Sequence, residues 1–265
     1  SGTNAQMTGY PSSGRNTFAG AALSVWAMAI NSHMPAYPTG GGSNFKTNNV
    51  RPSPEWFERN NYRWNNDPYA ETSARIINHI LARGTGWVNI NSADESDECS
   101  LTVLSNGNSR TSSCTPIPGT NNSRGAYSNG STNVYYQGVT LSSLATVLPA
   151  LAGSQLQTGG LTSLSWEAFI QEMTDYMGYQ QIDSDCAKGG WYYSAFNGGG
   201  GCIYMDASTA QWGYIGLETA EVVGKDYGVI VSNRHKYRAA YAVTRNTASN
   251  GGAMYRTSGH GPDNL

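Results

Sequence analysis

Three charged residues at helical spacing are the first candidates for acid–base chemistry in this chain. Glu71, Arg75 and His79 are each four residues apart, so a helix would carry all three on one face. In a polar cavity His79 would act as the base, and Glu71 would orient its ring. The same spacing is typical of a solvated ionic ladder, in which each pair contributes roughly 0.3–0.5 kcal/mol. The sequence leaves both interpretations open.

An acidic cluster next to a cysteine is the only candidate metal site that the sequence offers. Asp94, Glu95, Asp97 and Glu98 precede Cys99, and flexible carboxylates are the ligands that Ca²⁺ prefers. The cluster lacks the spacing and the hinge glycine of an EF-hand, which favours a solvated loop. The four histidines share no metal-ligand spacing, so we expect no bound metal and no cofactor.

Aromatic side chains that follow glycines are the candidate binding residues. Trp87 follows one glycine, and the run Trp191, Tyr192 and Tyr193 follows a pair of them. Aromatic faces can bind sugar rings, and such side chains also fill the cores of helical bundles. Packing between helix ends is therefore the alternative for these residues, above all for Trp191.

The four cysteines fall into two local couples, Cys99 with Cys114 and Cys186 with Cys202. Four cysteines allow three disulfide pairings, and the local pairing closes the two shortest loops. Each short loop would contribute roughly 3 kcal/mol to stability in the chain-entropy model. No spacing typical of a zinc site is present, and four free thiols are the alternative. Disulfides would place the protein outside the cell or at its surface.

Composition excludes two classes of partner. Only 13% of the residues are charged and the net charge is −2, so no basic surface for nucleic acid is expected. No apolar run reaches the length of a membrane span, so we expect no membrane insertion. The chain begins at Ser1 without an initiator methionine or a signal peptide, which we interpret as a processed or incomplete part of a larger chain.

Apolar periodicity predicts six helices, separated by long loops rich in Gly, Ser and Asn. Capping residues mark several starts: Asn16, Asp67 followed by Pro68, Ser165 and Asp206. Strand-like alternation reaches a convincing length nowhere, so we expect an all-α fold. The predicted helices cover residues 17–31, 68–83, 134–152, 166–179, 207–223 and 234–245.

Glycine–aromatic segments recur between the predicted helices. Tyr127 to Trp191 and Trp191 to Tyr255 are both 64 residues apart, which indicates tandem helical hairpins. The unit formed by Gly189-Gly190-Trp191, a loop and a helix opening at Asp206 resembles the repeats of the α/α-toroid superfamily. That superfamily includes terpenoid cyclases, protein prenyltransferase β-subunits, complement thioester domains and some polysaccharide lyases.

The resemblance implies a partial α/α toroid, with residues 1–265 forming a single domain of stacked hairpins. It does not imply a chemistry, because fold and function separate in this superfamily. Asp183-Ser184-Asp185-Cys186 ends in cysteine where the acid motif of terpenoid cyclases ends in aspartate. The segment 201–205 does not match the thioester motif either.

We therefore expect an extracellular, non-catalytic module for binding or for assembly of a cell-surface structure. Its expected partners are other copies of itself or flanking domains, with a polysaccharide as a further candidate ligand. The alternative is a carbohydrate-active enzyme, a lyase or hydrolase, that would act in the toroid cleft.

Overall fold

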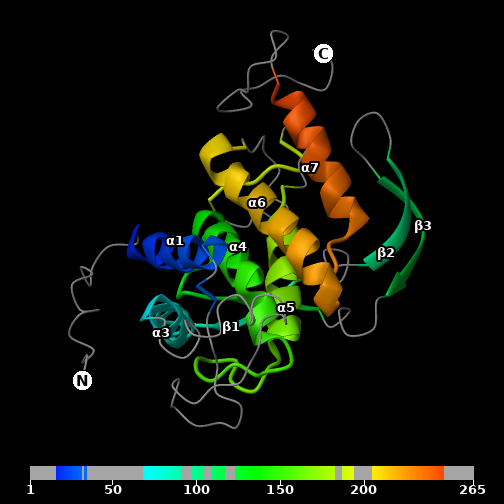
Figure 1. Ribbon diagram of the computed structural model, residues 1–265. Helices are drawn as coiled ribbons and strands as arrows, with labels where there is room; N and C mark the ends of the chain where they lie inside the picture. The colour runs from blue at the N-terminus through cyan, green and yellow to red at the C-terminus, as the bar shows by residue number, and fades with distance from the viewer. Residues whose placement is uncertain are drawn as a thin grey trace.

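The described part of the chain is mainly helical. The computed structural model describes residues 16–31, 33–34, 68–90, 97–103, 109–116, 123–182, 187–193 and 205–247. Its elements, shown in Figure 1, are α1 (Asn16–Ile30), α3 (Pro68–Ala82), β1 (Gly86–Asn89), β2 (Asp97–Val103), β3 (Ser109–Pro116), β4 (Arg124–Tyr127), α4 (Val134–Leu151), α5 (Trp166–Tyr179), α6 (Ala207–Gly224), the short 3₁₀ helix η3 (Lys225–Tyr227) and α7 (Asn233–Arg245).

All six predicted helices are confirmed, although Asn16, the expected cap of the first helix, is the first residue of α1. The starts of α5 and α6 follow from local capping chemistry. The Ser165 hydroxyl accepts a hydrogen bond from the Ala168 N–H at 3.2 Å, and the Asp206 carboxylate accepts one from the Thr209 N–H at 3.0 Å. Each bond satisfies a backbone donor in the first turn that has no partner within the helix. Pro149 lies in the last turn of α4, and that helix ends two residues later, at Leu151.

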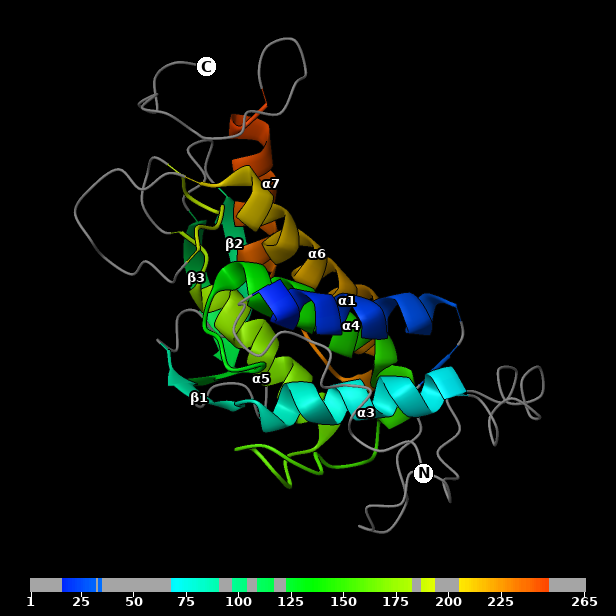
Figure 2. The ribbon, with the colours of Figure 1, turned by 90° about the vertical axis from the view of Figure 1, so that its left-hand side faces the viewer.

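Alternate helices lie side by side. Helix α4 packs against both α1 and α6. In addition, α3 packs against α1, and α5 packs against both α4 and α6. Figure 2 shows α1 and α3 running alongside each other. α1, α4 and α6 each follow a glycine–aromatic segment in the sequence, and α4 contacts both of the other two helices.

Most of helix α4 is buried although it carries several hydroxyl groups. The Ser142 and Ser143 hydroxyls donate to the carbonyls of Gly138 and Val139, both at 2.8 Å. Thr146 donates in the same way to the Ser142 carbonyl at 2.7 Å. Such bonds to the preceding turn let hydroxyls be buried without any partner on another helix.

Glycines bring the backbones of α4 and α6 into contact. A Cβ atom at Gly138 would lie 2.3 Å from the Trp212 carbonyl oxygen, which no real contact allows. Across the same crossing, a Cβ atom at Gly216 would lie 3.2 Å from the Gly138 carbonyl oxygen. The two helices are therefore closer than side chains would permit.

Four short strands in the long loop after α3 differ from the purely helical expectation. β1 pairs with β4, and β2 pairs with β3. Both described sheets are two-stranded and antiparallel. β2 and β3 are rich in Ser, Thr and charged residues. Strands pair through backbone hydrogen bonds, which any residue type can make. Because β2 and β3 lack an alternation of apolar and polar residues, the sequence pattern does not predict them.

The register of β2 and β3 places Cys99 opposite Cys114. Directly opposed residues of antiparallel strands have Cα atoms about 4.5–5.5 Å apart, within the range that a disulfide spans. The other two cysteines, Cys186 and Cys202, lie outside the described residues.

We predict that Gly138→Ala destabilises the fold by at least about 1–3 kcal/mol, because the added methyl group forces α4 and α6 apart. Gly20→Ala is the matched control, since Gly20 lies within α1 with nothing within 4 Å of its Cβ position. We expect the control to gain roughly 0.5–1 kcal/mol from reduced backbone entropy. Urea unfolding followed by circular dichroism measures both, and equal effects would contradict the close crossing.

We predict a disulfide between Cys99 and Cys114. Mass spectrometry of a non-reduced digest should yield one linked peptide pair that separates on reduction. Replacing Cys99 by Ser should lower the free energy of unfolding by about 3 kcal/mol, because the crosslink closes a short loop. Recovery of both residues as alkylated thiols would contradict this pairing.

Candidate functional site

The structure places the acid–base candidates on the outside of α3. Arg75 and His79 are exposed, while Ile77 and Ile80 on the other side of the helix are buried in the core. Partial burial of the His79 ring and the nearby Arg83 charge both lower the pKa of His79. Glu71 belongs to the same helix, but its side chain is outside the described residues. The two described side chains lie in the environment of a solvated ladder.

The acidic cluster falls mainly outside the described structure. Asp97 and Glu98 are the first two residues of β2, but their side chains are outside the described structure. Asp94 and Glu95 precede that strand and are not described. Within the described ranges, no group of three His, Cys, Asp or Glu side chains could hold a metal ion.

Trp191 is a core residue. Its side chain is fully buried, its indole N–H donates to the Met177 carbonyl at 3.0 Å, and its ring meets Tyr214 edge-on at 5.1 Å. A side chain enclosed in this way cannot stack on a ligand from solvent, so the core-packing alternative describes Trp191.

The two glycines before Trp191 are explained by close packing. A Cβ atom at Gly189, whose φ is +88°, would lie 1.9 Å from the Arg238 carbonyl oxygen on α7. One at Gly190 would lie 2.5 Å from the Met205 sulfur. Gly189 therefore lets the α5–α6 loop lie against α7, and Gly190 lets it lie against Met205, which gives this motif a structural role.

The remaining aromatic candidates reach the surface in two different elements. Tyr193 is 37% exposed in the loop after α5, and its ring meets that of the half-buried Tyr192 edge-on at 5.2 Å. Trp87, in β1, is 38% exposed, and the Arg124 guanidinium covers its ring at 4.3 Å. Tyr193 and Trp87 thus keep the exposure that a binding residue needs.

The most distinctive surface is one that the sequence analysis did not single out. Helix α1 has no charged residue in its 15 positions, and its side away from α4 exposes Leu23, Ala27 and Ile30. Leu23 is 38% and Ile30 is 68% exposed. These residues are spaced four and three positions apart, so they form one stripe, which we call the α1 stripe.

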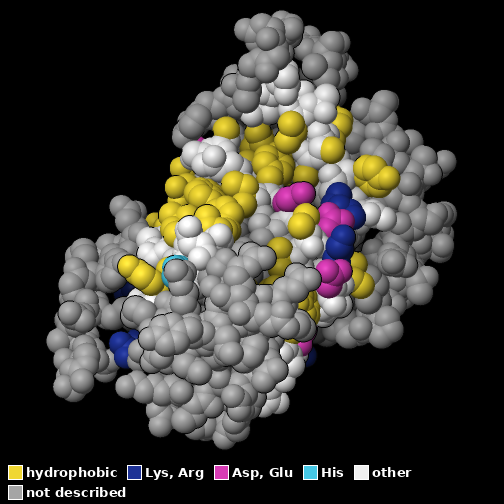
Figure 3. Space-filling model, in the orientation of Figure 1, with side chains coloured by type: hydrophobic (Ala, Val, Ile, Leu, Met, Phe, Trp, Pro, Cys, Tyr) yellow, Lys and Arg dark blue, Asp and Glu magenta, His cyan; other side chains and the backbone are white. Residues whose placement is uncertain are grey.

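Aromatic rings lie between the α1 stripe and α6. The half-buried Trp26 of α1 meets Trp212 of α6 edge-on at 6.5 Å, and Trp212 meets Tyr135 of α4 at 5.8 Å. Figure 3 shows hydrophobic side chains gathered over α1 and α6 on this face of the molecule. The missing charges in α1 were the sequence signal that could have identified this surface.

Comparisons of the chain with protein-family models, with curated proteins and with solved structures find no match. Among the described helices, none is both long and apolar enough to cross a membrane.

Two buried phenols report on the packing around α5 and α6. Burial raises the pKa of Tyr176 to about 12 and also raises the pKa of Tyr214 well above its usual range. The Tyr176 hydroxyl donates to the Thr132 carbonyl at 3.3 Å. Burial therefore favours the protonated form of both tyrosines in the folded state.

We predict that the protein loses stability as the pH rises from 10 to 12. In this window tyrosines of the unfolded chain lose protons while Tyr176 keeps its own, so the free energy of unfolding falls with pH. One such group contributes up to about 1.4 kcal/mol per pH unit. Denaturant unfolding at several pH values should show a weaker pH dependence for Tyr176→Phe than for the parent chain.

Tyr69→Phe, at an exposed position of α3, is the control for removal of a phenolic hydroxyl group. The same pH dependence in both variants would show that Tyr176 ionises freely in the folded state.

Proposed function

We propose that this protein is a non-catalytic module that self-associates outside the cell through the α1 stripe. The observation that carries the proposal is the exposure of Leu23 and Ile30 on a helix without a single charge. Isolated apolar side chains are common on protein surfaces, but a continuous apolar stripe is typical of an interface.

The position of α1 in the helix layer supports this function. α1 packs against α3 and α4, and Leu23, Ala27 and Ile30 are the described residues of α1 that these contacts leave exposed. Its outer side is as apolar as a side that packs against another helix. A second copy that places a helix there would continue the lateral packing, as the next unit of a repeat array does.

The composition of the chain suits close contact between copies. With 13% charged residues, two surfaces of this protein can meet with few ions to desolvate. Aromatic residues are enriched in the cores of protein interfaces, and Trp26 lies next to the exposed stripe. Fully burying an exposed leucine or isoleucine contributes about 1.5–3 kcal/mol. Ile30, which is 68% exposed, would supply the larger part of such a gain, and Leu23, which is 38% exposed, the smaller part.

The extracellular location is part of the proposal and depends on the cysteines. The opposed positions of Cys99 and Cys114 in β2 and β3 support a disulfide, and such crosslinks persist in oxidising compartments.

We predict that the full chain forms oligomers in a concentration-dependent manner, as measured by sedimentation equilibrium. The double variant Leu23→Glu with Ile30→Lys should shift the equilibrium to the monomer, weakening association by at least tenfold, because association would bury two charges. Its unfolding midpoint, measured at a concentration where both proteins are monomeric, should stay close to that of the parent chain, since both side chains are exposed.

Val243→Glu provides the matched control. Val243 is exposed on α7, outside the α1 stripe, and the change should leave association unaltered. A parent chain that remains monomeric at every concentration, or a control that dissociates like the double variant, would contradict the proposed interface.

A further inference from the structure

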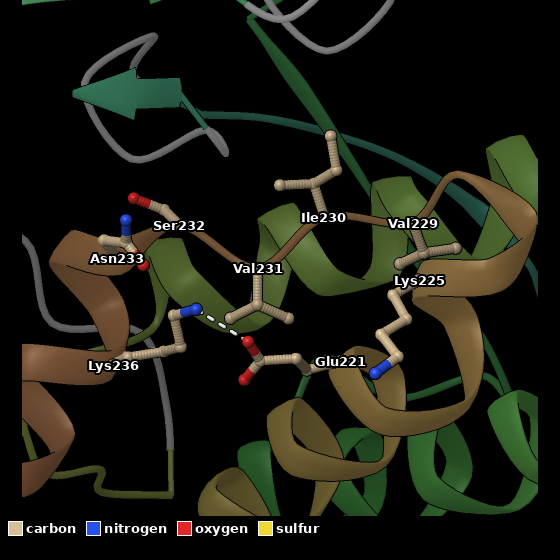
Figure 4. Close-up of a pocket in the computed structure, with 8 residues that line it drawn as sticks. All are labelled: Glu221, Lys225, Val229, Ile230, Val231, Ser232, Asn233 and Lys236. Atoms are coloured by element: carbon tan, nitrogen blue, oxygen red, sulfur yellow. Dashed lines mark hydrogen bonds and ion pairs between the residues drawn. The ribbon is translucent and has the colours of Figure 1, made fainter.

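The extended segment that joins α6 to α7, residues 229–232, is covered. Ile230 in this segment, drawn in Figure 4, exchanges two hydrogen bonds with the side chain of Gln171, at 2.7 and 3.0 Å. Val229 and Val231 are only 2% and 5% exposed. This segment therefore offers no backbone edge to a partner, in contrast to strand β1.

Strand β1 pairs with β4 through only one of its two edges. The Ile90 N–H, directly after β1, donates to the Ser123 carbonyl at 3.1 Å, so these two residues continue the ladder as a hydrogen-bonded pair. Hydrogen-bonded and non-hydrogen-bonded pairs alternate along antiparallel strands, so the next hydrogen-bonded residue of β1 is Val88. The N–H and C=O groups of Trp87 and Asn89 consequently point away from β4.

These outward groups of Trp87 and Asn89, which we call the β1 edge, belong to surface residues. Trp87 is 38% exposed, and Asn89 is exposed as well. Neither backbone has a hydrogen-bond partner beyond the β1–β4 ladder among the described residues. β4 is the main neighbour of β1 in the described chain, and β4 packs in turn against α5. The β1 edge is therefore in a position to accept a further strand.

Strand β1 lacks the features that keep natural edge strands apart. Such strands often carry a lysine, a proline or a β-bulge. The sequence Gly86-Trp87-Val88-Asn89 contains neither a charge nor a proline, and its register with β4 runs without a bulge. Arg124 is the one charged residue of β1 and β4, and its guanidinium covers the Trp87 ring of its own chain at 4.3 Å. The residues of β1 therefore do not oppose pairing with another strand.

We propose that the β1 edge pairs with the β1 edge of a second copy, in an antiparallel arrangement that places Trp87 of each chain opposite Asn89 of the other. Each of these pairs exchanges two backbone hydrogen bonds, as in strand addition to a sheet edge. Val88 then lies opposite Val88 of the second copy, on the twofold axis. The two sheets join into one, with β4 of each copy on the outer side.

A second copy is the occupant that β1 itself fits. Trp87 and Asn89 present the outward groups, and antiparallel pairing brings each of them to the other residue of the second copy. The strand is therefore complementary to itself, as an interface with twofold symmetry requires. The directly opposed side chains are Trp with Asn and Val with Val, so no like charges face each other.

The β1 contact would extend the assembly that the α1 stripe begins, and in this respect it rests on the proposed function. A surface that packs against itself closes at two copies, whereas two such surfaces on one chain continue into an open row of copies. A strand of four residues buries less surface than a standard interface, so we expect the β1 contact to be the weaker of the two. It should form at higher protein concentration than the contact at the α1 stripe.

Cysteine crosslinking of the full chain tests the register. In Val88→Cys the two new thiols are directly opposed in a non-hydrogen-bonded pair, with about 4.5 Å between the Cα atoms, which a disulfide can span. Mild oxidation at high protein concentration should therefore link two chains, and a reductant should separate them. The parent chain, treated in the same way, gives the background from its own cysteines.

Asn89→Cys is the matched control for this crosslink. Asn89 is opposed by Trp87 of the second copy, so the two new thiols are offset by two residues, or about 7 Å along the strand. That offset exceeds what a disulfide spans, and Asn89→Cys should crosslink at least about fivefold less than Val88→Cys.

Sedimentation velocity tests the consequence for assembly. Asn89→Pro removes an outward N–H that the β1–β4 ladder does not use, and proline is tolerated on edge strands. It should weaken the β1 contact by about tenfold, so species larger than two copies should disappear while pairs formed through the α1 stripe remain. Asn89→Ala keeps the N–H and should assemble like the parent chain.

Three results would overturn the inference. If Val88→Cys crosslinks no more than Asn89→Cys, the strands do not pair in this register. If Asn89→Pro keeps the larger species, or if the parent chain stops at two copies at every concentration, the β1 edge does not extend the assembly. Pairs that survive Leu23→Glu with Ile30→Lys would contradict the proposed function instead, because Val88→Cys reports the β1 contact without the α1 stripe.

Discussion

The contact between Gly138 and the backbone of α6 determines how the described helices pack. The absence of a side chain at this position lets the Trp212 carbonyl approach α4, and Gly216, one turn further along α6, lies against the Gly138 carbonyl. Because α4 also packs against α1 and α5, the α4–α6 separation fixes the positions of helices on both of its sides. Gly213, one residue beyond Trp212, leaves the space that the Trp191 ring fills. A few glycines thus connect the helix layer to the buried aromatic core.

Buried glutamine side chains hold several loops in place through hydrogen bonds to the backbone. Gln137 holds the Ser128 backbone through two hydrogen bonds, of 3.2 and 2.7 Å, and Gln171 holds Ile230 in the same way. Gln181 donates to the carbonyls of Gly189 and His235, which attaches α7 to the α5–α6 loop. An amide offers both a donor and an acceptor without the desolvation cost of a charge. Low charge and an ordered set of loops are therefore compatible.

Local chemistry explains how much of the fold could be predicted from the sequence. Caps such as Ser165 and Asp206 act within one turn, so the starts of these helices could be predicted from the sequence. The strands were not, because β2 and β3 pair through backbone groups that carry no sequence pattern. The sequence shows that Leu23 and Ile30 are apolar residues of a predicted helix. Only the packing of α1 shows that their side chains are exposed. The same limit applied to Trp191, which belongs to the core although its aromatic run was a binding candidate.

The hydroxyls of α4 have a consequence for how such a core can change over time. Ser142 and Ser143 are bonded to carbonyls of their own helix, so no other element depends on them. An exchange of either serine for alanine removes the donor together with a small volume and leaves the acceptor in its helical hydrogen bond. These core positions can therefore accept other small residues, whereas Gly138, one turn before Ser142, cannot accept any side chain. Divergent sequences with this fold should conserve a core position for its lack of a side chain more strictly than for its polarity.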